Sequence, residues 1–210
     1  MKTCRMLGWA FISLVAVLLA GCGGGGGPAT LFSDDFESYC GDGPEWPGDW
    51  VDASAGQEGG DGVVGIVVDD ASPQGRVAKH TDGGWCWMVY GAFTGSDYTY
   101  HLKIKPGSAA VGMGLTGRVT DSGDYYYLQI SGGNKLDLFK SYDDGATYEQ
   151  VCSTVAISYG TDTYYQLKLV CKGNQITGYF EDSSISYTDD GIAHGPVITA
   201  GKIGFVGDED

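Results

Sequence analysis

The chain has 210 residues, with 36 glycines, 14 tyrosines and a formal net charge of −15. This length suits one domain with a single core, and the abundance of tyrosine and tryptophan excludes a fibrous or disordered chain despite the glycine content. The negative charge argues against binding to nucleic acid or anionic lipid, which needs clustered Lys and Arg, and the few helix formers predict an all-β fold with many turns.

Residues 1–21 have the pattern of an export signal. A positively charged start precedes an apolar run from Met6 to Ala20, which is shorter than the ~20 residues that a membrane-spanning helix needs. The run ends in L-A-G-C at 19–22, which resembles the lipobox of bacterial lipoproteins. The resemblance implies cleavage before Cys22 and a lipid on Cys22. The alternatives are an ordinary secretory signal and an uncleaved anchor.

Residues 22–30 are expected to form the lipidated cysteine and a tether. The glycine run at 23–27 makes a flexible link that holds a domain off a surface without fixing its orientation. Gly23, the residue after the cysteine, does not resemble the signal that retains bacterial lipoproteins at the inner membrane. The resemblance therefore implies a domain over 31–210 that is anchored by lipid to the outer membrane of a Gram-negative cell.

Four cysteines remain after the predicted lipidation site: Cys40, Cys86, Cys152 and Cys171. In an exported chain they suggest two disulfides, for which three pairings exist. Cys152 and Cys171 lie symmetrically about G-T-D at 160–162, between two strand-like runs. A hairpin there favours Cys152–Cys171, with Cys40–Cys86 by elimination. No Cys/His spacing indicates a metal site.

Alternating apolar and polar residues predict that most of the remaining chain forms strands. Turn-forming Gly, Asn, Asp and Ser separate the runs, and no stretch after Thr30 has a helical period. Many short strands with one apolar face each predict an antiparallel sandwich of two sheets. The predicted strands are residues 98–105, 111–116, 125–130, 135–139, 164–171 and 176–181.

Short motifs follow one another in the second half of the chain: G-L-T-G-R-V (114–119), D-S-G-D-Y-Y-Y-L-Q-I (121–130), L-D-L-F-K (136–140), Y-Y-Q-L-K-L-V (164–170), G-N-Q-I-T-G-Y-F (173–180) and G-P-V-I-T-A-G-K-I-G-F (195–205). In this order they resemble the concanavalin A-like lectin/glucanase fold, in its laminin-G-like bacterial surface branch. L-F-S-D-D-F-E-S at 31–38 matches the first strand of such domains, and Trp50 lies where they often place a core tryptophan. The resemblance implies a jelly-roll sandwich with a common role in binding carbohydrate.

One departure from this family concerns the end of the chain. Such domains usually continue after the G-K-I-G-F strand with a further strand that pairs near the first one, whereas this sequence stops at Asp210. We therefore expect a jelly roll in which the last strand is missing or replaced. A missing strand leaves the edge of the first strand exposed.

The sequence lacks the spacing of familiar catalytic groups. It has no G-x-S-x-G elbow, no E-x-D-x-x-E strand to place two carboxylates on one face, and none of the Q-x-H or arginine-bearing strands of the polysaccharide lyases. S-Y-D-D-G-A-T-Y at 141–148 fits the Asp-box of sialidases, but it occurs once, and we interpret it as a hairpin turn. We expect no catalysis, with a divergent polysaccharide hydrolase or lyase as the alternative.

Acidic residues near both ends of the domain suggest calcium as the one candidate cofactor. If the first and last strands are neighbours, carboxylates from separate segments converge, and such oxygen ligands suit Ca²⁺. No EF-hand spacing is present. The candidate ligands are Asp35, Glu37 and Asp208.

Carbohydrate binding needs aromatic faces for stacking and polar groups for hydroxyls. Outward-facing strand residues supply both, although tyrosines also form and pack strands without any ligand role. The candidate ligand-binding residues are Arg118, Tyr125, Tyr127, Gln129, Asp137, Tyr179, Trp85 and Trp87.

Together these patterns predict a lipid-anchored cell-surface sandwich that binds poly- or oligosaccharide without catalysis. A surface interaction or structural protein without sugar binding is the second hypothesis. Exposed aromatic side chains on neighbouring strands are the observation that distinguishes the two.

Overall fold

The structure is a computed structural model of the chain. No helix in the described part is long and apolar enough to cross a membrane. Only the backbone is described at 11–19, 29–34, 63–68, 76, 81–82 and 208. In all, the structure describes residues 11–19, 29–34, 49–54, 63–68, 76–82, 84–107, 112–161 and 163–208.

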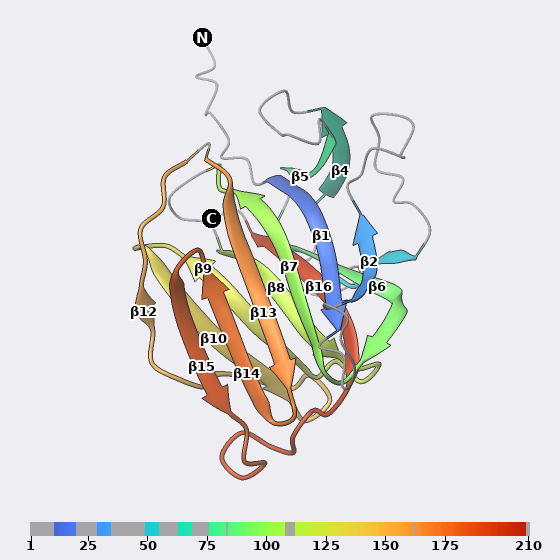
Figure 1. Cartoon of the computed structure of the whole chain (residues 1–210), viewed down its shortest axis with the longest axis vertical. Helices are drawn as coiled ribbons and strands as arrows, with labels where there is room; N and C mark the ends of the chain where they lie inside the picture. The colour runs from blue at the N-terminus through green and yellow to red at the C-terminus, as the bar shows by residue number, and fades with distance from the viewer. Residues whose placement is uncertain are drawn as a thin grey trace.

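The described strands form two antiparallel sheets that pack face to face, as the sequence predicts (Figure 1). Sheet A lies in front in Figure 1 and has the order β15-β14-β13-β7-β1-β5-β4, with β2 paired to β1. Its strands are β15 (Ser183–Thr188), β14 (Gln175–Phe180), β13 (Tyr165–Lys172), β7 (Tyr98–Lys105), β1 (Phe11–Leu19), β5 (Arg76–Asp82), β4 (Val63–Val68) and β2 (Ala29–Asp34).

Sheet B lies behind sheet A and has the order β11-β10-β9-β8-β16-β6-β3, with β12 paired to β10. All of its strand pairs are antiparallel. Its strands are β11 (Thr147–Gln150), β10 (Lys135–Tyr142), β9 (Tyr125–Ser131), β8 (Gly112–Val119), β16 (Gly201–Asp208), β6 (Cys86–Gly95), β3 (Trp50–Asp52) and β12 (Val155–Ala156).

The core lies between the sheets and follows the predicted alternation. On β7, Tyr100 and Leu102 are buried, whereas His101 between them is only partly covered. The predicted core tryptophan is confirmed, because Trp50 is buried with its ring centroid 5.2 Å from that of Phe205. Burial of each such side chain contributes roughly 1.5–3 kcal/mol. This gain turns the apolar face of β7 inward.

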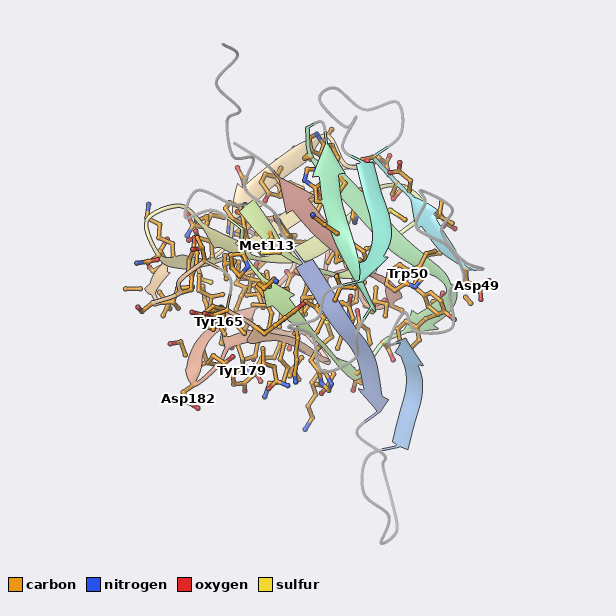
Figure 2. All side chains as sticks on the ribbon, turned by 90° about the horizontal axis from the view of Figure 1, so that it is seen from above. Asp49, Trp50, Met113, Tyr165, Tyr179 and Asp182 are labelled. Atoms are coloured by element: carbon orange, nitrogen blue, oxygen red, sulfur yellow. The ribbon has the colours of Figure 1, made fainter. Side chains whose placement is uncertain are left out.

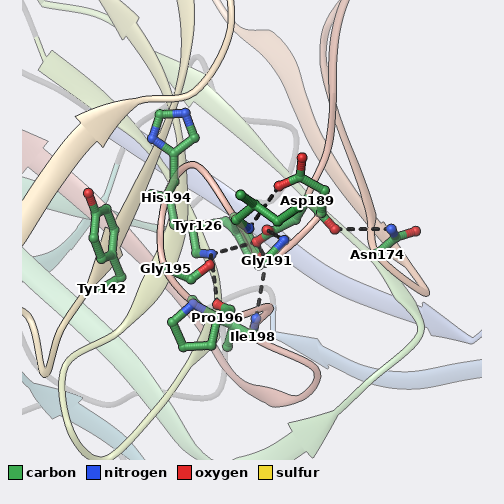
Figure 3. Close-up of polar contacts among 12 residues, drawn as sticks. Tyr126, Tyr142, Asn174, Asp189, Gly191, His194, Gly195, Pro196 and Ile198 are labelled. Carbon is green, nitrogen blue, oxygen red and sulfur yellow. Dashed lines mark hydrogen bonds and ion pairs between the residues drawn. The ribbon is translucent and has the colours of Figure 1, made fainter.

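A buried ion pair ties the segment after β15 to sheet B (Figure 3). Lys140 of β10 donates to Asp189 over 2.6 Å and to the carbonyl of Pro196 over 2.8 Å, and the side chains of Lys140 and Asp189 are fully buried. The hydroxyl of Tyr126 donates to the same carboxylate oxygen over 2.5 Å. We call Tyr126, Lys140 and Asp189 the buried polar network. It holds residues 189–198 against the sandwich.

Strand β1 comes from the segment for which the sequence predicts the apolar part of a signal peptide. It lies in the middle of sheet A, paired with β7 on one side and with β2 and β5 on the other. Residues 11–19 therefore form the strand beside β7. The sequence instead predicts that residues 31–38 form the first strand of the domain. Removal of residues 1–21 on export stays a prediction.

The predicted disulfide between Cys152 and Cys171 is wrong, since both thiols are free. Cys171 lies in the core on β13 of sheet A, and Cys152 lies between β11 and β12, which both pair with β10 in sheet B. The expected hairpin between them does not form, because the two flanking runs belong to different sheets. Cys40 lies outside the described residues, so the pairing Cys40–Cys86 stays a prediction.

The Asp-box sequence forms the hairpin turn between β10 and β11, as predicted. Its Ser141 hydroxyl donates to the carbonyl of Gly123 over 3.1 Å, and the amide of Gly145 donates to the Asp124 carboxylate over 3.1 Å. Both contacts reach the neighbouring turn between β8 and β9. The motif therefore joins two turns at one end of sheet B.

Candidate functional site: an aromatic cleft on sheet B

The outer face of sheet B has small residues along its middle strands. Thr116 of β8 pairs with Gly204 of β16, and Gly114 lies two positions before Thr116. A Cβ added at Gly114 would collide with the backbone carbonyl of Leu128 and lie 2.9 Å from the Tyr127 ring. One at Gly204 would lie 2.5 Å from the carbonyl oxygen of Met88 and 3.3 Å from the Trp87 indole nitrogen. The absence of side chains at these two positions therefore lets large rings from the flanking strands lie across the middle of the sheet.

Five aromatic rings from β6, β9, β10 and β11 meet on this face. The ring centroids of Trp87 and Tyr125 are 4.8 Å apart, and Phe139 stacks on Tyr148 with centroids 4.8 Å apart and planes at 8°. Tyr125 and Tyr148 are 6.4 Å apart, and Tyr127 lies 6.3 Å from Phe139. Aromatic pairs at these separations gain about 0.5–1.5 kcal/mol beyond their burial, so the rings hold one another in place.

These rings surround a cleft of about 350 Å³, which is near the lower limit of small-molecule sites, about 300–1,000 Å³. Tyr148 is 46% exposed, so the cleft opens to solvent beside its ring. We call it the aromatic cleft. It is lined by Trp85, Trp87, Tyr125, Tyr127, Gln129, Phe139, Tyr148 and Val206.

Polar groups of the sheet orient the lining. The indole nitrogen of Trp87 donates to the hydroxyl of Thr116 over 3.0 Å, which fixes the ring above β8. Asp137 pairs in register with Gln129 and accepts a hydrogen bond from Gln150 over 3.0 Å. Asp137 is buried beside the cleft rather than in its lining. Its carboxylate therefore supports the neighbouring strands.

The residues that line the cleft in the described part of the chain carry no formal charge. Burial raises the pKa of Tyr125, and burial together with the charges of Tyr125 and Asp137 raises the pKa of Tyr148. Both phenols are therefore protonated at neutral pH, and their hydroxyls are available as hydrogen-bond donors. Such a surface suits a neutral ligand with one apolar face and several hydroxyls.

Five residues that the sequence singles out for ligand binding line the cleft together: Trp85, Trp87, Tyr125, Tyr127 and Gln129. Sequence reasoning missed the other lining residues, Phe139, Tyr148 and Val206. The alternation that turns Asp137 outward also turns Phe139 outward, so that signal was present. For Tyr148 and Val206 the strand order is needed, because they reach the cleft from β11 and β16.

Arg118 lies away from the cleft, in contrast to the sequence-based expectation. Its side chain is fully buried, where it donates to the carbonyl of Ile198 over 2.7 Å and to that of Ser96 over 2.7 Å. Its backbone has a positive φ of 52°, which turns the side chain toward the core side of sheet B. The guanidinium thus fastens two loops to the sandwich and does not face the cleft.

Tyr179 also lies elsewhere, on β14 of sheet A. Its ring packs under the ammonium group of Lys168 at 3.9 Å, a cation–π contact on the outer face of that sheet. Figure 2 shows Tyr179 and Asp182 on one side of the molecule, well apart from Asp49 and Trp50. Tyr179 therefore does not reach the cleft on sheet B.

The calcium prediction falls largely outside the described residues. Asp35 and Glu37 are not described, and of Asp208 only the backbone is. Among the side chains that the structure does describe, no group of three His, Cys, Asp or Glu is placed to hold a metal ion.

A tyrosine and a histidine converge at a second place, at the end of β10. Tyr142 donates to the Glu149 carboxylate over 2.8 Å, and the Nδ1 atom of His194 lies 2.9 Å from the same oxygen. These contacts lower the pKa of Glu149, the hydrogen bond from His194 having the largest effect. Glu149 is exposed, and none of the three residues is among those that line the aromatic cleft.

No protein-family profile matches the chain. Among curated proteins, the extracellular exo-alpha-L-arabinofuranosidase of Streptomyces chartreusis is 27% identical over 165 residues, which are 77% of this chain. The chain spans only 18% of that enzyme's length.

Among solved structures, carbohydrate-binding module CBM66 from Bacillus subtilis overlaps with a TM-score of 0.55 at 18% identity, over 77% of this chain and 88% of that one. The beta-glucanase of Bacillus licheniformis overlaps with a TM-score of 0.45 at 15% identity, over 70% of this chain and 66% of that one. The chain thus has the fold predicted from its sequence, an all-β jelly-roll sandwich of two antiparallel sheets like that of the carbohydrate-binding module.

Proposed function

We propose that the protein is a non-catalytic carbohydrate-binding domain and that the aromatic cleft is its binding site. The observation that carries the proposal is the group of five aromatic rings on the outer face of sheet B, gathered around a cleft of about 350 Å³ without charged lining residues. Sugar rings combine an apolar C–H face with hydroxyl edges. Aromatic faces beside amide and phenol groups match both features.

Two findings support sugar binding in preference to a purely structural role. The cleft joins the exposed ring of Tyr148 to the partly covered rings of Trp85, Tyr125 and Phe139, and a contiguous apolar surface marks binding sites more often than single exposed side chains do. The fold also resembles that of a carbohydrate-binding module.

The lining also favours binding without hydrolysis. Glycosidases of the usual kind act through two carboxyl groups about 5–10 Å apart across the scissile bond. Among the side chains that the structure describes, none in the lining of the aromatic cleft is a carboxylate, and Asp137 beside the cleft is engaged in hydrogen bonds within the sheet. The curated relative is an arabinofuranosidase that this chain matches over a small part of its length. Arabinose-containing glycans are therefore sensible first ligands to test for binding.

We further propose that a lipid on Cys22 anchors the domain at the bacterial cell surface. This rests on the L-A-G-C sequence at 19–22 and on the glycine run that follows it. A lipid-anchored binding domain at the outer membrane would hold the cell on a polysaccharide, or hold the polysaccharide for enzymes nearby.

A glycan array probed with the full-length protein tests sugar binding, and matched tyrosine variants test the site. Tyr148→Ala removes an exposed ring of the cleft, whereas Tyr179→Ala removes a tyrosine of sheet A's outer face. We expect Tyr148→Ala to weaken binding about tenfold or more, as truncation of an aromatic contact costs ~1–2 kcal/mol, and Tyr179→Ala to leave binding unchanged. A folded protein that binds no glycan would leave a surface interaction protein as the better explanation.

A further inference from the structure

A second depression adjoins the aromatic cleft on the outer face of sheet B. It has a volume of about 310 Å³, and Trp87 lines both sites. Its floor is aliphatic, from Val51, Val89 and Val119. Its polar residues include Asp121, Ser122 and Lys202, at the turn between β8 and β9 and the start of β16.

We infer that the two sites are successive subsites for one neutral oligosaccharide chain, which crosses Trp87 with one unit in the aromatic cleft and the next over the valine floor. The inference rests on the proposed function and adds the substrate class to it. It predicts a ligand bound along its length rather than a single terminal sugar.

The chemistry of the second site is that of a sugar site. The three valines offer an apolar surface to the C–H face of a ring, and the polar residues offer hydroxyl, carboxylate and ammonium groups to its edge. Val51 is 56% exposed, so its side chain is accessible to a ligand that lies in this depression. The fixed indole of Trp87 gives the chain a rigid crossing point between the two sites.

Charge restricts the ligand to neutral glycans. The one cation among the described residues that line either site is Lys202, whose ammonium group lies 2.6 Å from the Asp121 carboxylate. That contact holds the pKa of Asp121 below its usual value, so the carboxylate stays ionised beside the ammonium group and the two charges offset one another. With a formal charge of −15 on the chain, a polymer of uronic acids meets repulsion and no free cation in these sites.

Size supports a chain over a single unit. Each site is near the lower limit of small-molecule pockets, about 300 Å³, and suits one or two sugar units. When two linked units occupy adjoining sites, the second binds at the high effective concentration that the first one creates. Affinity should therefore rise with chain length until both sites are filled.

Calorimetric titration of the full-length protein with neutral oligosaccharides tests this inference. The probes are arabino-, xylo-, cello- and malto-oligosaccharides of one to five units, with oligogalacturonates as the acidic comparison. In the series that binds, we expect affinity to rise at least tenfold between one and three units and then to level off, and we expect no binding of the oligogalacturonates. Affinity that does not rise with length, or tighter binding of the acidic series, overturns the inference.

Variants separate the two sites. Val51→Asp places a charge in the second depression and should abolish the gain with length, which is measured relative to the single-unit affinity of the same variant. Ile192→Asp, at an aliphatic side chain that is 83% exposed on the segment after β15, should alter neither quantity, and thermal midpoints of both variants show that they fold. Retention of the gain in Val51→Asp contradicts the inference. Absence of binding at every length in every series removes the proposed function as well.

Discussion

Three consecutive tyrosines, residues 125–127, belong to two regions of opposite character. Tyr126 faces the core, where its hydroxyl, the Lys140 ammonium and the Asp189 carboxylate form the buried polar network (Figure 3). Tyr125 and Tyr127 face the other way and line the aromatic cleft. In the network the charges are buried and paired. In the cleft the lining is uncharged and opens to solvent.

The contrast shows how polar groups divide between stability and binding in a sandwich. A buried charge is tolerable only when paired and hydrogen-bonded, and in the network Lys140 reaches Asp189 together with the carbonyls of Gly195 and Pro196. Groups that are so fully engaged with the protein have nothing left for a ligand. The cleft presents the exposed ring of Tyr148 and the partly covered rings of Tyr125 and Phe139, whereas Trp87 and Tyr127 are largely buried. Variants of core-facing residues on β9 and β10 should therefore alter unfolding, whereas variants of outward-facing residues on these strands should alter binding.

Lys140→Met should give the largest effect, a loss of about 3–5 kcal/mol in the free energy of unfolding. It leaves the Asp189 carboxylate buried without its counter-ion. Urea denaturation measures the loss, and sugar binding below the unfolding transition should be unchanged. The double variant Lys140→Met/Asp189→Leu removes the stranded charge and should recover much of the stability. If the single variant unfolds like the wild type, the network contributes little to stability.

Tyr126→Phe should cost about 1–3 kcal/mol of unfolding free energy, because it leaves Asp189 without one of its buried donors. The same substitution one residue earlier, Tyr125→Phe, removes a hydroxyl on the outer face and should alter stability by less than about 0.5 kcal/mol. Its effect should appear in sugar affinity instead. Equal losses of stability in both variants would contradict the division of this tripeptide between two regions.

The loss of unfolding free energy in Lys140→Met should depend on pH. This dependence should be smaller than the loss itself, and it identifies Asp189 as the group involved. Burial raises the pKa of Asp189, but Lys140 and Tyr126 lower it by more, so the net pKa lies below its usual value. The wild type therefore keeps this stabilisation above about pH 4, the pKa of an unfolded aspartate, and loses it as the pH falls through the lower folded value. In Lys140→Met the burial remains together with the hydrogen bonds from Tyr126 and from the Gly191 amide, but the ammonium group is lost, so protonation of Asp189 becomes easier. The stability difference between the two proteins should shrink from pH 7 to pH 3 in urea titrations, and a constant difference would show that Asp189 is not the group involved.

Alternation along the strands was enough to predict the fold class and the division of residues 125–127. It also predicted five lining residues of the cleft, because turning outward is a local property of a strand. It did not predict which sheet a strand joins. Tyr179 was therefore grouped with residues of the other sheet. Arg118 was expected at the ligand because alternation gives no sign of the positive φ that turns its side chain inward. Pairing over long sequence separations decides such points, and no local pattern encodes it.

The same limit explains why the sequence did not predict the place of residues 11–19 in sheet A. It also explains why a disulfide between Cys152 and Cys171 was wrongly predicted. Residues 11–19 are apolar and β-branched enough to serve either as a signal peptide or as β1, and composition cannot separate the two. Metabolic labelling with palmitate in a Gram-negative host separates them, since we expect label on the wild type and none on Cys22→Ser. Unlabelled wild-type protein that retains residues 1–21 would favour β1 as a permanent strand.

Cys152→Ser should have the smallest effect on the free energy of unfolding. No disulfide joins Cys152 to Cys171, and the sandwich is held instead by the buried polar network and by the packing of the rings. Loss of a native disulfide typically costs 2–5 kcal/mol, whereas replacement of a partly buried thiol should cost about 1 kcal/mol or less. Burial raises the pKa of the Cys171 thiol to about 11, so this group resists oxidation as well as being out of reach of Cys152 on the other sheet. Alkylation of the denatured, unreduced protein followed by peptide mass spectrometry should label both residues. A linked peptide containing the two cysteines would instead require sheets A and B to be joined covalently, and Cys152→Ser would then cost as much as Lys140→Met.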